Sequence, residues 1–142
     1  IATMIPALDI STSGLAAQRV RMNAISGNLA NISTTHNEEG EPAPYQPRFA
    51  VFQTDESVGS GGAAGVRVSS VEIADVEPLY RYEPHHPDAI KDGKWKGYVA
   101  YPNVNMMTEF TDAMEAARAY EANLGAIEIA KDLTNQTLRI IA

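Results

Sequence analysis

The sequence predicts an α+β fold in which two long terminal α-helices form a coiled-coil-like axial core, with a small β-rich domain inserted between them. Apolar residues recur at alternating three- and four-residue steps near both ends, as in helices that bury a narrow stripe against a partner helix. The middle instead holds seven of the eight prolines and several short runs of β-branched and aromatic residues. We therefore divide the chain into an N-terminal axial helix (1–35), a β-rich outer domain (36–103) and a C-terminal axial helix (104–142).

The N-terminal stripe predicts a helix over about residues 6–32, because proline is tolerated in a first turn and a Ser-Thr-Thr cluster follows. Gly14 and Gly27 interrupt it, and each glycine disfavours a helix by about 1 kcal/mol relative to alanine. Two explanations stay open: local flexibility, or a neighbouring backbone that approaches where a side chain is missing. We expect subunit-interface residues along this stripe, namely Leu8, Leu15, Met22, Ile25, Leu29 and Ile32.

Four strands are expected in the middle, over residues 49–53, 66–73, 79–82 and 95–101, because these runs are β-rich and bounded by glycine or proline. A glycine-rich stretch, 59–65, separates the first two and predicts a flexible surface loop. The prediction for this region is thus a set of short strands around one loop.

The C-terminal helix should begin near Asn105, whose side chain is suited to capping a first turn that acidic residues follow. Basic residues near its other end, Lys131 and Arg139, also suit the helix dipole. Its expected interface residues are Met106, Phe110, Ala113, Ala117, Tyr120, Leu124, Ile127, Leu138 and Ile141.

Charge and composition exclude several classes of function. A net charge of −7 argues against nucleic-acid binding, which needs clustered cations. Cysteine is absent, so thiolate chemistry is excluded. No apolar run approaches the roughly 20 residues that span a bilayer, and we expect no membrane insertion. Residues 1–35 carry one acid and two bases whereas 104–142 carry six acids and three bases, so the two stripes are weakly complementary.

Enzyme and metal chemistry find little support. The 59–65 stretch is followed by a strand-like run rather than the helix that a dinucleotide fingerprint needs, and we expect no cofactor. His85 and His86 are adjacent and lack the His-x-x-x-His spacing of helical metal sites, so a polar turn is the favoured interpretation. A metal-binding module or enzyme centred on these histidines remains an alternative.

The partner of the two stripes is left open by periodicity, which fits an antiparallel hairpin inside one subunit as well as assembly between subunits. A self-contained helical-hairpin adaptor is therefore a second alternative. Further apolar residues flank both stripes, and they favour neighbouring copies as the additional cover. Terminal segments that depend on such neighbours should be marginal in isolation.

Motifs inside the two stripes resemble those of flagellar axial proteins. The N-terminal run from Ser13 to Thr35 is similar to their N-terminal signature, and residues 115–123 are similar to a C-terminal motif of the form Ala-x-Arg-x-Tyr-x-x-Asn. Within that family, residues 97–104 (Gly-Tyr-Val-x-x-Pro-Asn-Val) narrow the likeness to a proximal rod subunit. The motif residues are Ser13, Gly14, Leu15, Gln18, Asn28, Leu29, Ala30, Asn31, Arg118, Tyr120 and Asn123.

The resemblance implies a structural subunit of the bacterial flagellar basal-body rod, located in the periplasm. It implies assembly into a helical tube that transmits torque, after export by the flagellar type III apparatus. The partners implied are other copies of the chain, rod proteins such as FlgB, FlgF and FlgG-like subunits, and the rod-to-ring adaptor FliE. It implies no catalytic role and no cofactor. Two departures from the family pattern are Gly27, where a second asparagine is common, and a lengthened stretch at 89–96.

Overall fold

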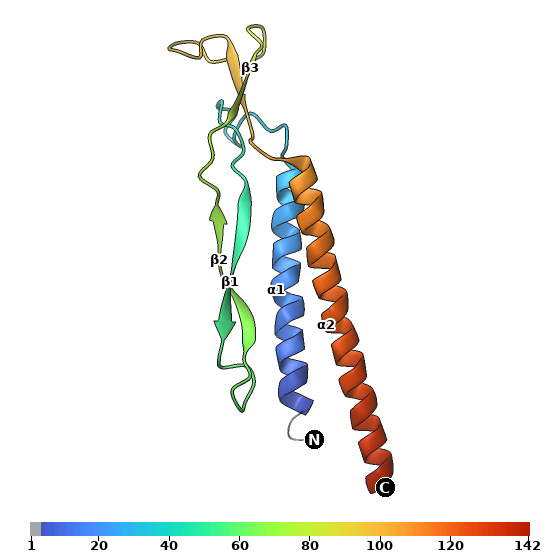
Figure 1. Cartoon of the computed structure of the whole chain (residues 1–142). Coiled ribbons are helices and arrows are strands. Elements are labelled where there is room, and N and C mark those ends of the chain that lie inside the picture. The colour runs from blue at the N-terminus through green and yellow to red at the C-terminus, as the bar shows by residue number, and fades with distance from the viewer. Residues whose placement is uncertain (1–3) are drawn as a thin grey trace.

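The computed structural model describes residues 4–142, in which two helices enclose four strands in chain order. The α+β prediction is confirmed (Figure 1). The elements are α1 (Met4–Ala30), β1 (Arg48–Asp55), β2 (Gly65–Ile73), β3 (Leu79–Tyr82), β4 (Tyr98–Tyr101) and α2 (Met106–Ile141).

Three long elements lie side by side: the β1–β2 hairpin, α1, and α2, with α1 in the middle (Figure 1). The helices run antiparallel, and at about 1.5 Å per residue they are roughly 40 Å and 54 Å long. The C-terminal turns of α2 therefore extend past the start of α1. The internal pairing of the two helices, one of the two arrangements left open by periodicity, is present within the chain.

Helix α1 ends at Ala30, two residues before the predicted end, so Ile32 lies outside the helix. The backbone amide of Ile32 bonds to the carbonyl of Leu29, three residues back, and tightens the chain into a turn. The side chain of Asn31 donates to the carbonyl of Gly27 at 2.9 Å and accepts from the Thr34 hydroxyl at 3.1 Å. These local bonds compete with continued helix and explain the early end.

Helix α2 begins as predicted. The Asn105 carboxamide oxygen accepts from the amides of Met107 at 3.0 Å and Thr108 at 3.2 Å, which satisfies two otherwise unpaired groups of the first turn. Glu109 lies in that turn and Arg139 in the last. None of the helices in the described part of the chain is both long and apolar enough to cross a bilayer.

The strands form two separate antiparallel hairpins, rather than one continuous sheet. In the β1–β2 hairpin Arg48 pairs with Ile73 and Asp55 with Gly65, with an irregularity between Val51 and Phe52. This long hairpin packs along α1, whereas β3–β4 forms a small tip beyond the helix ends (Figure 1). One inserted hairpin thus covers a side of α1, and the other forms the tip.

The prediction of a strand over 95–101 was wrong for its first three residues, because β4 starts at Tyr98. Gly93 and Gly97 both adopt positive φ, which turns the chain and excludes a straight strand there. Trp95 instead stacks on Tyr80, with ring centroids 4.2 Å apart. Its aromatic character, which suggested a strand, serves the packing of the tip.

The core is thin. Among the side chains that the structure describes, the buried hydrophobic ones are Ala17, Ile25, Val99 and Ala116, and three of these four lie where α1 and α2 run together. Such a small core contributes little burial to set against the entropy of ordering two long helices. Large apolar side chains remain exposed along the length of α2.

Candidate assembly interface

The contact between α1 and α2 follows a seven-residue repeat on each helix. Going up α1, Gly14, Arg21 and Asn28 face successive levels of α2. A Cβ atom on Gly14 would lie 2.7 Å from the Asn123 side-chain nitrogen, well inside van der Waals contact. Of the two explanations for glycine at this position, close approach of a neighbour is therefore the one that applies, although the neighbour is a side chain. A Cβ on Gly27 would meet only an ordinary contact.

Two helical turns after Gly14, the Arg21 guanidinium lies 3.3 Å from the Glu115 carboxylate and 3.8 Å from the Asp112 carboxylate. The charge complementarity expected between the terminal segments thus operates inside the chain at this level. Both acids are substantially exposed, so the pairs contribute at most about 1 kcal/mol each. Their role is to favour this alignment of the helices.

Asn28 connects three elements. Its carboxamide oxygen accepts from the Arg48 amide at 2.8 Å and the Tyr45 hydroxyl at 3.0 Å, and its nitrogen donates to the Arg48 carbonyl at 2.8 Å and to both Glu109 oxygens at 3.3 Å. Burial raises the pKa of the Glu109 carboxyl, and the hydrogen bond from Asn28 opposes that rise. This buried asparagine ties α1, α2 and the start of β1 together.

The other family-motif residues of α1 have mixed surroundings. The Ser13 hydroxyl donates to the Ile10 carbonyl at 2.6 Å and accepts from the Val66 amide at 3.1 Å, which ties α1 to β2. The Gln18 side-chain oxygen is buried without a hydrogen-bond partner among the described residues, and nothing in the structure explains it. Ala30 and, on α2, Arg118 are exposed. Asn123 donates to the Ala119 carbonyl at 3.0 Å.

The predicted N-terminal interface residues are largely covered inside the chain, by α2 and the β1–β2 hairpin. Ile25 is buried, and the others are half-buried: Leu8, Leu15, Met22, Leu29 and Ile32.

The predicted C-terminal interface residues fall into two groups. Half-buried residues are Ala113, Tyr120 and Ile127, whereas exposed ones are Met106, Phe110, Ala117, Leu124, Leu138 and Ile141. The internal contact instead centres on Glu109, Ala116 and Asn123, of which Ala116 is fully buried. This contact is shifted by one position from the apolar stripe. The stripe therefore remains partly exposed to solvent after the two helices pair.

The histidine-rich turn of the tip is engaged in other contacts. The Asp88 carboxylate accepts from the buried Thr35 hydroxyl at 2.6 Å and lies 3.3 Å from the His36 ring nitrogen. The Thr35 hydrogen bond, more than His36, lowers the pKa of Asp88. His86 accepts from the Asp88 amide, and His85 is exposed. Within residues 4–142, no three histidine, cysteine or acidic side chains converge to hold a metal ion.

Comparison with known proteins gives matches at both ends and over the whole length. Residues 8–36 match the family described as Flagella basal body rod protein, and residues 96–140 match the family described as Flagellar basal body rod FlgEFG protein C-terminal. A flagellar basal-body rod protein FlgC of Borreliella burgdorferi is 37% identical, over 94% of this chain and 95% of the relative.

Two further FlgC proteins are similar to this chain over nearly their whole length. The FlgC protein of Bacillus subtilis is 36% identical over 97% of this chain and 98% of its own length. That of Salmonella typhimurium is 36% identical over 93% of each.

Proposed function

The chain belongs to the FlgC family of flagellar basal-body rod proteins, and from this premise we propose that its terminal helices assemble it into a tube that transmits torque across the periplasm. Membership of the family makes it a structural subunit of the basal-body rod. The tube, the torque and the roles of individual residues are our inference from that membership and from the surfaces of the two helices.

The observation that carries the proposal is the apolar surface left on α2 after it has paired with α1. Phe110 is 50% exposed, Met114 59% and Leu124 40%. Monomeric proteins rarely leave several large apolar side chains of one helix in water, and such surfaces commonly mark protein–protein contacts. Together with the thin internal core, this surface supports a chain whose helices gain much of their burial by assembly.

Partners and export follow from the family alone. We propose that the neighbours include other copies of the chain, FlgB, FlgF and FlgG-like rod proteins, and the adaptor FliE, and that the flagellar type III apparatus exports it. Because the relatives are structural rod proteins, we propose no catalytic role.

Leu124→Asp tests the proposal. Leu124 is 40% exposed in the isolated chain, so a carboxylate at this position keeps contact with water and should lower the free energy of unfolding by only about 1 kcal/mol. In an assembled rod it would be buried without a partner, which disfavours assembly by several kcal/mol. Leu29→Asp should also stop assembly, but Leu29 is half-buried within the chain and its loss would perturb the fold as well.

Cells with the Leu124→Asp chain as their only copy should not swim, and basal bodies isolated from them should lack the chain. Ala122→Asp is the matched control, since Ala122 is exposed on the same helix but lies off the stripe. Normal swimming with Leu124→Asp would overturn the assignment of α2 as the assembly surface. Absence of the unmodified chain from isolated basal bodies would overturn the proposed function itself.

A further inference from the structure

A groove runs along α1 on its flank toward the β1–β2 hairpin. Its volume is about 1020 Å³, and the helix contributes small side chains to it, Val20, Ala24 and Gly27, while β2 contributes the half-exposed Val71 and Ile73. The small residues leave room beside the helix, and the two strand residues give the groove an apolar wall. Much of the remaining lining is polar and includes His36, Glu38 and Arg48, so the wall formed by Val71 and Ile73 is the part of the groove that suits large apolar side chains.

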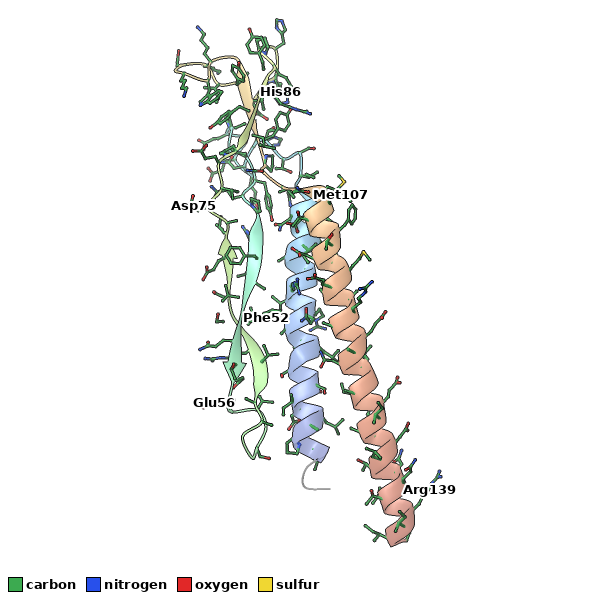
Figure 2. All side chains as sticks on the ribbon, in the orientation of Figure 1. Phe52, Glu56, Asp75, His86, Met107 and Arg139 are labelled. Carbon is green, nitrogen blue, oxygen red and sulfur yellow. The ribbon has the colours of Figure 1, made fainter. Side chains whose placement is uncertain are left out.

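On the other side of the molecule, α2 presents a ridge of such side chains. Met107 is 73% exposed, and Phe110 and Met114 follow at three- and four-residue steps, on the same side of the helix. Figure 2 shows Met107 pointing away from α1. The same stepping leads through Ala117 to the exposed Glu121. Methionine side chains adapt their shape readily, which suits them to filling an irregular groove.

The groove and the ridge lie at the same level along the long axis. At the upper level Asn28 bonds to both Glu109 and Arg48, and Arg48 pairs with Ile73. At the lower level Ser13 bonds to Val66 of β2, and the adjacent Gly14 contacts Asn123 of α2. The apolar wall of the groove is therefore level with the first turns of α2, where the ridge residues lie.

Charges at the lower level are complementary. Arg67 of β2 is exposed and is level with Glu121 of α2. Within the described residues Arg67 donates to Gln53 at 3.1 Å and lies near Asp55, whose carboxylate is bonded to Ser57. Below this level the match ends, because Asp9, which lines a separate pocket near the start of α1, would face the Glu128 region of a neighbour. The ionic contact is thus confined to Arg67 and Glu121.

We propose that the groove of one copy of the chain receives the α2 ridge of a second copy placed beside it, with Met107, Phe110 and Met114 against Val71 and Ile73, and Glu121 against Arg67. The two surfaces are different, so the contact is heterologous and repeats around a ring or helix instead of closing a dimer. The inference rests on the proposed function, and it assigns one lateral contact of the tube.

A disulfide test can detect this contact directly, because the natural chain has no cysteine. In the double variant R67C/E121C the two cysteines of one chain belong to β2 and α2, and these two elements flank α1 on opposite sides (Figure 1). Helix α1 with its side chains is about 10 to 12 Å across. A disulfide needs Cα atoms within about 7 Å, so only neighbouring copies can be joined. Mild oxidation of basal bodies should give a ladder of covalent dimers, trimers and larger species.

The matched control is R67C/E115C, since Glu115 is exposed on the same helix but on the side that contacts Arg21. It should give no ladder. If the chain is present in basal bodies but the two variants give the same result, the lateral contact is refuted and the proposed function stands. If a photo-crosslinking amino acid at position 67 joins the chain to a different rod protein instead of to a second copy, the assignment of a second copy is refuted. Absence of the unmodified chain from basal bodies would refute both inferences.

Charge reversal gives an independent readout. Arg67→Glu or Glu121→Arg alone should reduce the number of swimming cells by roughly tenfold, because each places like charges together. The combined variant R67E/E121R restores opposite charges at every repeat of the contact and should recover swimming. A combined variant that is as defective as the singles would refute the pairing.

Discussion

Gly14 and Asn123 offer a direct test of how the two helices are held together. Gly14→Ala would place a Cβ atom 2.7 Å from the Asn123 side-chain nitrogen, about 0.8 Å inside the closest comfortable separation. Alanine at an interior helical position otherwise gains about 1 kcal/mol over glycine. The sign of the stability change therefore depends on what the close contact with Asn123 costs.

Two responses can relieve the overlap, and both are unfavourable. If the Asn123 carboxamide swings away, it loses the hydrogen bond to the Ala119 carbonyl, at about 1 kcal/mol, and a half-buried polar group is left poorly satisfied. If the helices separate by about 0.8 Å, dispersion contacts along the whole pair weaken by a quarter to a half. Either response should exceed the helical gain, so we expect net destabilisation of about 1 to 2 kcal/mol.

A double-mutant cycle isolates this contact. In an Asn123→Ala background the overlap disappears, and Gly14→Ala should then stabilise the chain by about 1 kcal/mol. The coupling energy between the two sites should thus be about 2 to 3 kcal/mol. Urea unfolding followed by the far-ultraviolet circular dichroism of the helices measures all four free energies.

Gly125 supplies the control, because a Cβ atom there meets nothing within 4 Å. Gly125→Ala should stabilise the chain by about 1 kcal/mol in either background, and it offers a more stable host in which to repeat the cycle. If Gly14→Ala is as stabilising as Gly125→Ala in the unmodified chain, close approach does not explain Gly14, and the alternative of local flexibility is restored.

Two further predictions concern the polar connections. Asn28→Ala should lower the free energy of unfolding by about 2 to 3 kcal/mol, because groups of Tyr45, Arg48 and Glu109 lose their hydrogen-bond partner. The control Ser26→Ala, at an exposed position nearby, should change this free energy by less than about 0.5 kcal/mol. If the two variants have equal effects in urea titrations, the role of Asn28 is contradicted. The tip should loosen in acid, because the pKa of Asp88 is lower in the folded chain than in the unfolded chain. The stabilisation contributed by the ionised Asp88 carboxylate is therefore present above the unfolded pKa of about 3.9 and is lost as pH falls below that pKa. Trp95, the single tryptophan, reports this by fluorescence, and a pH profile that Asp88→Asn leaves unchanged would refute the assignment.

The sequence was sufficient to predict the helices and the order of the elements, because apolar periodicity, the Asn105 cap and β-branched runs act locally. It was insufficient for the helix contact. Apolar spacing selected Phe110, Ala117 and Leu124, whereas the buried position is Ala116. Small residues such as Ala116 let the helices approach closely, but apolar periodicity does not take the size of a side chain into account.

The partners of Asn28 could not be predicted either. They lie 20 residues away at Arg48 and 81 away at Glu109, and only the folded chain brings them together. Family resemblance marked Asn28 as important without giving its role. The error at Trp95 has a different origin, because a propensity for strands was overruled by the two glycines with positive φ.

The one-position shift between the apolar stripe and the internal contact has a functional consequence. If the large apolar residues of α2 faced α1, they would be buried within the chain, and α2 would present only polar surface to neighbours. Because small and polar residues such as Ala116 and Asn123 make the internal contact, Phe110, Met114 and Leu124 stay available. In the proposed assembly those side chains lose their water when another subunit covers them, so their burial would stabilise the assembly and not the isolated chain. The internal pair sets the alignment of the two helices, and we propose that the surface that it leaves uncovered drives their association with neighbours.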